Sequence, residues 1–133
     1  MATATKFDVE ALRSGPEGHD ADGMTDLYAD DAESTTVDAS NPPSRPRVLR
    51  GKEEIAAYWR DVMDRGMMHK IEKLVVGDDS VAYQVACQYD DGTKVLASVV
   101  CDVADDGKIA RETVVQAWDS WWPRSGGWAF SPG

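Results

Sequence analysis

From Met67 onward, apolar and polar residues alternate with a period of two, which is the period of a β-strand. Short runs rich in aspartate and glycine divide this stretch, so strands are expected at residues 67–76, 81–90, 93–104 and 108–119. Two of the dividing runs contain Asp-Gly, which favours a two-residue hairpin turn. The pattern therefore predicts a four-stranded antiparallel meander.

The first half of the chain has helical periodicity in three places, namely residues 7–13, 20–28 and 52–64. We expect the first helix to end before Pro16, which has glycines close on both sides, because proline does not continue a helix. Asp20 is a suitable N-cap for the second helix. The third has one continuous apolar stripe, as expected of a helix that packs on a sheet.

A short strand is expected at residues 33–38, followed by a loop at 39–47, where three prolines exclude regular structure. With helices first and the meander last, the chain is predicted to be an α+β protein. Its 133 residues suit one domain, which we place at residues 1–119. Residues 120–133 form a C-terminal tail rich in aromatic residues, glycine and proline.

Two-residue turns would fix which residues of the four strands lie opposite one another and share a face. One face is then small and apolar with a few polar groups, and the other is aliphatic. A sheet that is apolar on both faces needs two partners, so we expect helices on one face and a homodimer through the outer face. Small residues beneath helices leave a cavity, whose aromatic neighbours are either pocket walls or ordinary core. The expected cavity residues are Tyr28, Trp59, Met63, Gln84, Gln88, Val99, Gln116 and Trp118.

Two runs of residues resemble a known family: Leu27-Tyr28-Ala29-Asp30-Asp31-Ala32, and Leu49-Arg50-Gly51 followed by Glu54-Ile55. They are similar to motifs of the SnoaL-like branch of the nuclear-transport-factor-2-like superfamily, which includes polyketide cyclases and ketosteroid isomerases. The resemblance covers roughly residues 7–119. It implies a cystatin-like α+β barrel, in which a cone-shaped, curved antiparallel sheet wraps around about three N-terminal helices and an apolar pocket.

The functional residues of ketosteroid isomerases do not carry over to this chain. The position of their general base, after the Ala-Asp-Asp-Ala run, falls on Thr36. Their oxyanion-hole acid falls on Val99, and the tyrosine of their first helix falls on Leu12. The resemblance thus implies the pocket but not the usual isomerase groups, in a fold that hosts enzymes and non-catalytic dimers alike.

Three other residues are candidates for acid–base catalysis. His69 is expected to face the cavity, with a reference pKa suited to neutral pH, or else to be a hydrogen-bonded histidine at a strand end. Glu112 is expected inside, where burial would raise its pKa, or else at the rim, paired with Arg111 or Lys73. Asp38 either substitutes for the missing base or caps a turn.

Other classes of function find little support. A net charge of −10 argues against nucleic acid as a partner, and no stretch approaches transmembrane length. The first ten residues contain no apolar region of the kind a signal peptide has, and Cys87 and Cys101 are expected on opposite faces without a disulfide, so the cytoplasm is the expected location. There is no zinc spacing, phosphate loop or dinucleotide motif, so neither a metal nor a cofactor is expected. His19, in the break after the first helix, is a weaker second histidine.

Two hypotheses of function follow. The first is a cofactor-independent isomerase, cyclase or dehydratase that acts on a small, largely apolar, carbonyl-bearing molecule through acid–base groups. The second is a non-catalytic module that binds a small hydrophobic metabolite or serves for dimerisation. Polar groups on the expected cavity face favour the first, and the missing isomerase groups favour the second.

Overall fold

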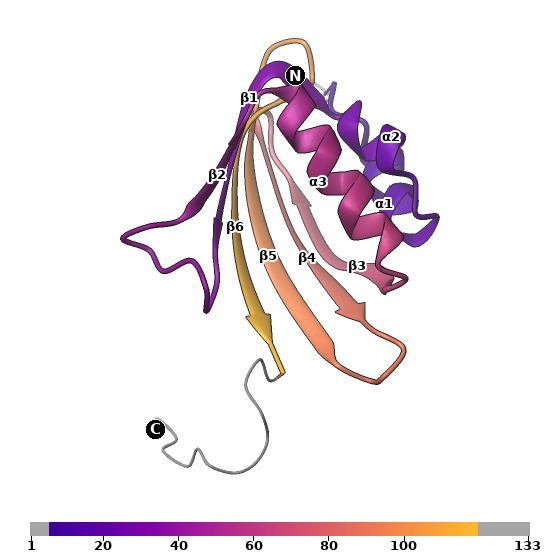
Figure 1. The fold of residues 1–133 in the computed structure, drawn as a ribbon. Coiled ribbons are helices and arrows are strands. Elements are labelled where there is room, and N and C mark those ends of the chain that lie inside the picture. Colours follow the sequence, from indigo (N-terminus) through magenta and orange to yellow (C-terminus); the bar gives the residue numbers. More distant parts are fainter. Residues whose placement is uncertain (1–5, 120–133) are drawn as a thin grey trace.

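A computed structural model describes residues 6–119, which form three helices and six strands (Figure 1). The tail expected at residues 120–133 lies outside the described residues. The helices are α1 (Val9–Glu17), α2 (Ala21–Thr25) and α3 (Lys52–Asp64). The strands are β1 (Tyr28–Val37), β2 (Arg47–Arg50), β3 (Met68–Val76), β4 (Ser80–Gln88), β5 (Lys94–Val103) and β6 (Ile109–Trp118).

All six strands belong to one sheet with the order β2-β1-β6-β5-β4-β3. Neighbouring strands are antiparallel except β1 and β6, which are parallel. The sheet is strongly curved, and the three helices lie together on its concave side (Figure 1). This arrangement confirms the predicted α+β fold with a curved sheet around three N-terminal helices. No helix in residues 6–119 combines the length and the apolar character needed to cross a bilayer.

The third helix and the meander lie where the sequence predicts them. Helix α3 has the predicted bounds, and each meander strand is within two residues of its predicted limits. On α3, Ile55, Val62 and Met63 are buried, so its apolar stripe faces the core. Glu54 also accepts a hydrogen bond from the backbone N–H of Arg50, which fixes the entry of the chain into the helix.

The first two helices differ from the prediction. Helix α1 runs through Pro16 and ends at Glu17. Gly15 lies inside the helix, and its lack of a side chain leaves room for Met24 of α2 to pack against it. A Cβ at Gly15 would be 2.7 Å from the Met24 Sδ. The second helix ends at Thr25, not at Tyr28, because Tyr28 pairs with Ile109 and begins β1, which is four residues longer than the predicted strand.

The predicted register is wrong for β4. The turn after β4 contains three residues, with Gly92 in the left-handed conformation (φ 91°), because Tyr89 and Thr93 still pair through their backbones. A shift of one residue reverses every side chain of a strand. Gln84 and Gln88 therefore share the outer face with Met68 and Ser98, and neither is a cavity residue.

The same shift brings a different set of β4 side chains to the inner face. Tyr83 and Cys87 now face inward, and a bulge in β3 between Ile71 and Lys73 keeps His69 opposite Cys87. Cys101 also faces inward, so the prediction that the two cysteines point to opposite faces is wrong. Both are free thiols. A bulge in β6 between Ile109 and Arg111, opposite Val103 and Asp102 of β5, offsets the three-residue turn at Gly107, and the predicted register of β6 is correct.

Candidate functional site

A cavity of about 60 Å³ lies between the concave face of the sheet and helix α3. Its lining is mostly aliphatic and aromatic. Of the predicted cavity residues, four line it: Trp59, Val99, Gln116 and Trp118. Tyr28 and Met63 are buried in the core beside the cavity, so sequence reasoning placed them near its wall but not in it.

Glu112 on β6 is the buried acid of this cavity. Its side chain is only 6% exposed, and both carboxyl oxygens accept hydrogen bonds. The Tyr28 hydroxyl donates to Oε2 at 2.6 Å, and the Ser34 hydroxyl donates to Oε1 at 2.7 Å. The Cys101 thiol lies 3.8 Å from Oε2. The carboxyl group is thus held in one orientation by three neutral donors.

No cation compensates the charge of this carboxyl group. Within residues 6–119, Glu112 forms no ion pair, and it does not pair with Arg111 or Lys73 at a rim. Burial raises the pKa of Glu112, although the hydrogen bonds from Tyr28, Ser34 and Cys101 lower it in part. Because burial dominates, Glu112 holds its proton at a higher pH than an exposed glutamate does.

His69 on β3 lines the same cavity and is 7% exposed. Its Nδ1 lies 3.2 Å from the Sγ of Cys87, its cross-strand partner. Burial raises the pKa of Cys87 to about 11, so this residue is a thiol at neutral pH. Burial, followed by the neighbouring His19, lowers the pKa of His69, so the imidazole is neutral.

These charge states favour one tautomer of His69. When the Cys87 thiol donates its hydrogen to Nδ1, the ring proton is on Nε2. His69 Nε2 is buried and has no hydrogen-bond partner among the described residues. The imidazole therefore carries one unused N–H donor in a site that is otherwise largely apolar. Sequence reasoning missed Cys87 because the predicted register had placed it on the outer face.

His19 lies beside His69, with 5.5 Å between the ring centroids and 62° between the ring planes. It adopts φ 55° just after α1, where a left-handed residue commonly ends a helix. Its Nε2 lies 2.6 Å from the carbonyl oxygen of Met67, to which it donates. Since His19 does not line the cavity, its effect on the site passes through His69.

Asp38 does not belong to the site. Its carboxylate accepts hydrogen bonds from the backbone N–H of Ser40 and from the backbone and side-chain nitrogens of Asn41, at 2.9 to 3.0 Å. It therefore caps the turn after β1, and the structure does not bring it together with Glu112 and His69. Thr36, at the position of the isomerase base, does line the cavity but supplies only a hydroxyl group.

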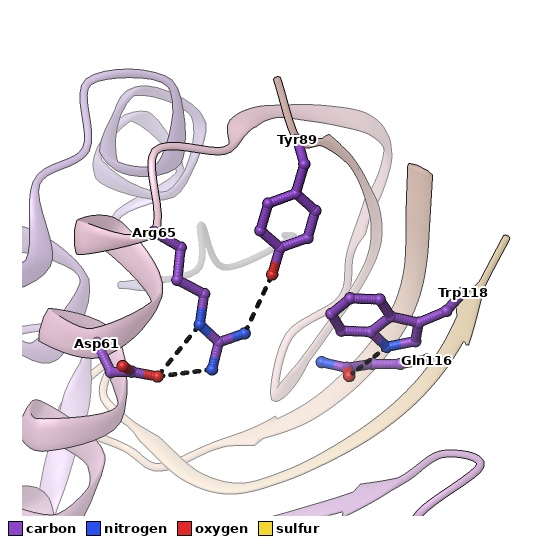
Figure 2. A network of polar contacts seen from close by, with 5 residues as sticks. All are labelled: Asp61, Arg65, Tyr89, Gln116 and Trp118. Carbon is purple, nitrogen blue, oxygen red and sulfur yellow. Dashed lines mark hydrogen bonds and ion pairs between the residues drawn. The ribbon is translucent and has the colours of Figure 1, made fainter. Parts of the chain in front are cut away.

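A network of polar and aromatic residues lies near the C-terminal ends of α3 and β6 (Figure 2), and three of its members line the cavity, namely Arg65, Gln116 and Trp118. The Arg65 guanidinium donates to Asp61 Oδ2 at 2.6 Å and reaches the Tyr89 hydroxyl at 3.5 Å. The Tyr89 and Trp118 rings are stacked, with centroids 5.8 Å apart, and Trp118 Nε1 donates to Gln116 Oε1 at 3.4 Å. The spacing of four residues between Asp61 and Arg65 is enough to predict an ion pair on a helix. The contacts of Tyr89 with Arg65 and with Trp118 join different elements, so the sequence does not predict them.

The site is therefore suited to acid–base chemistry on a small molecule. It offers a buried carboxyl group of raised pKa and a neutral imidazole with a free N–H, both facing one cavity with largely apolar walls. In the part of the chain that is described, no three His, Cys, Asp or Glu side chains are grouped as metal ligands would be.

Solved structures with the same fold come from several bacterial proteins. A SnoaL-like protein of unknown function from Burkholderia thailandensis is 25% identical, with a TM-score of 0.59 over 84% of this chain and 90% of that one. A protein from Kribbella flavida, provisionally named a ketosteroid isomerase, is 16% identical, with a TM-score of 0.68 over 89% and 80%. The epoxide hydrolase/cyclase-like enzyme SalBIII, with a role in pyran ring formation in the polyether salinomycin, is 20% identical, with a TM-score of 0.63 over 85% and 92%.

A comparison with curated proteins finds no match. The model of the SnoaL-like domain, in contrast, matches residues 9–112, which is most of the chain and ends at the buried glutamate of the cavity. This match agrees with the two sequence runs and with the curved sheet around three helices. The chain belongs to the SnoaL-like domain family.

Proposed function

We propose that this protein is a cofactor-independent enzyme that moves a proton on a small, largely apolar carbonyl compound, in an isomerisation, cyclisation or dehydration. The observation that carries the proposal is Glu112, a buried carboxyl group with neutral donors on both oxygens and no ion pair among residues 6–119. Burial without a compensating cation brings the pKa of a carboxyl group toward the pH at which it both accepts and returns a proton.

His69 complements this group as a hydrogen-bond donor. When ionised Glu112 removes a proton from the carbon next to a carbonyl group, negative charge develops on the carbonyl oxygen. His69 is three strands away from Glu112 and six residues farther along the sheet, so its Nε2–H binds a second polar group of the ligand and not that oxygen. The proton on Glu112 then returns to the product at another carbon or leaves with a hydroxyl group as water. In this role His69 orients the substrate, and Glu112 transfers the proton.

The proposed reaction is tested by deuterium exchange at the α-carbons of small cyclic ketones in D₂O, followed by proton NMR. The wild type should accelerate exchange for at least one ketone of the panel, and Glu112→Gln should abolish the acceleration. Glu72→Gln, which changes an exposed glutamate of β3, is the matched control and should retain it. Thermal unfolding of all three proteins verifies the fold. Full exchange by a folded Glu112→Gln variant would rule out this role for Glu112.

A non-catalytic pocket is the competing function, and the same experiment separates the two. A wild type that binds the ketones without exchanging their protons is a binding protein. Cys87 and Cys101 are free thiols on the inner face of the sheet, which is in keeping with the cytoplasm as the place of action.

We also propose a homodimer through the outer face of the sheet. Five large apolar side chains are exposed on this face, namely Met68, Val75, Leu96, Val100 and Val115. Their cross-strand neighbours around the centre are neutral, although the chain has a net charge of −10. Charged residues of both signs lie at the ends of the face, where Asp102 is opposite Arg111. A second copy related by a twofold axis matches a neutral centre with such a rim.

A further inference from the structure

We propose that the ligand of the cavity is a small keto acid, and that Arg47 binds its carboxylate at the edge of the cavity. This inference rests on the proposed function and deepens it, because it adds an anionic group to the carbonyl compound. It is carried by the position of Arg47, by its lack of an anionic partner and by the chemistry of the guanidinium group.

Arg47 points toward the inner side of the sheet. It is the first residue of β2 and lies directly opposite Thr36 of β1. Residues opposite one another share a face, and Thr36 is buried and lines the cavity. The Arg47 guanidinium carbon lies 4.9 Å from the centroid of the Tyr58 ring, which also lines the cavity. The side chain is thereby fixed between the sheet and α3.

The charge of Arg47 has no carboxylate partner in the described part of the chain. Arg50 pairs with Glu33 and Arg65 pairs with Asp61, but Arg47 forms no ion pair. Its Nε is buried and makes no hydrogen bond. The other arginines of residues 6–119 that lack an ion pair are exposed, namely Arg13, Arg45, Arg60 and Arg111.

The buried Nε–H of Arg47 has no acceptor, which is costly unless a ligand supplies one. The planar fork of arginine matches the two oxygens of a carboxylate, and stacking on an aromatic ring holds the fork in place without neutralising it. The cation–π contact with Tyr58 therefore prepares Arg47 for an anion, and the ligand provides the missing acceptor.

The sheet sets the distance between the two ends of this ligand. Thr36 pairs with Arg47 on one side and with Val114 on the other, so Arg47 is two strands from β6, or about 10 Å. Glu112 lies on β6, one inward-facing position from Val114. A molecule with a carbonyl group near Glu112 and a carboxylate across one ring from it spans this distance.

The test compares 4-acetylbenzoate with 4-acetylbenzamide, which have nearly the same shape and differ in charge. Isothermal titration calorimetry measures both affinities for the wild type, Arg47→Gln and Arg50→Gln. Arg50 is the matched control, because it lies on the same strand with an exposed side chain paired to Glu33. The wild type and Arg50→Gln should bind the carboxylate at least about tenfold more tightly than the amide. Arg47→Gln should bind both equally.

Three results would overturn the assignment: no binding of either compound, equal affinities in the wild type, or a preference for the carboxylate that survives in Arg47→Gln. Glu112→Gln separates this inference from the proposed reaction, since it should lose proton exchange but keep the carboxylate preference. If the wild type prefers the carboxylate but does not accelerate proton exchange, the Arg47 site is supported and the proposed enzymatic reaction is not. If it accelerates proton exchange without preferring the carboxylate, the reaction is supported and the Arg47 site is not.

Discussion

At the scale of single residues, the site combines a neutral imidazole with a carboxyl group whose pKa is raised. His69 is neutral because burial and His19 lower its pKa, and Cys87 directs its remaining proton to Nε2. Glu112 is neutral over a wider pH range than an exposed glutamate because burial raises its pKa. A proton can therefore pass between carboxyl group and substrate without an ion pair having to break first.

The raised pKa of Glu112 also makes stability depend on pH. Above the ordinary pKa of 4.5, the unfolded state releases this proton before the folded state does. Stability from this group is thus complete below that value and declines as the pH rises toward the folded-state pKa. The free energy of unfolding of the wild type should fall more steeply above pH 4.5 than that of Glu112→Gln, by at most about 1.4 kcal/mol per pH unit.

Urea unfolding of both proteins at several pH values measures this difference. The common effects of net charge and of His69 cancel, since both proteins share them. Parallel curves for the two proteins would mean that burial does not perturb Glu112.

At the scale of elements, the sequence predicted which segments are strands better than how they are aligned. The alternation after Met67 and the stripe of α3 were sufficient for the element bounds, because periodicity reports burial directly. The register depends on one extra turn residue at Gly92 and on a bulge near Glu72, neither of which changes the local periodicity. The predicted register of β6 is correct, so Glu112 was placed in the interior. The predicted register of β4 is off by one residue, so Gln84, Gln88 and Cys87 were assigned to the wrong faces.

The contact between α1 and α2 gives a prediction at the same scale. Gly15→Ala should destabilise the protein by about 1–3 kcal/mol, because the new methyl group would lie 2.7 Å from the Met24 Sδ in a buried contact. In a Met24→Ala background the same change should be neutral or stabilising by up to about 1 kcal/mol, since alanine is the better helix former. Urea unfolding of the four proteins completes the cycle. An equal loss in both backgrounds would show that Met24 is not the cause.

At the scale of the whole molecule, the two faces of the sheet carry different kinds of side chains. The concave face holds the cavity and its polar groups, and the outer face holds most of the exposed large apolar side chains. The expected pairing of the four meander strands indicated apolar residues on both sides of the sheet. It did not place Arg47 and Tyr58 together, because that contact joins a short edge strand to a helix.

The outer face leads to a prediction about assembly. Val100 is 57% exposed near the middle of this face, so Val100→Glu should place like charges against each other across a twofold axis and give a monomer. Ala57→Glu adds the same charge on the exposed side of α3 and should remain dimeric. Static light scattering at micromolar concentration distinguishes the two states. A wild-type monomer under these conditions would contradict the homodimer.

The parallel pairing of β1 with β6 has a consequence for the order in which the molecule is built. Strands β3 to β6 follow one another through short turns and can zip together from local contacts, whereas β1 must wait for β6, the last strand of the sheet. The bonds from Tyr28 and Ser34 to Glu112 join residues 84 and 78 positions apart. On a ribosome, the acid of the cavity would therefore be held in place only after β6 had emerged, so any activity that depends on Glu112 would begin only once this last strand of the sheet had paired with β1.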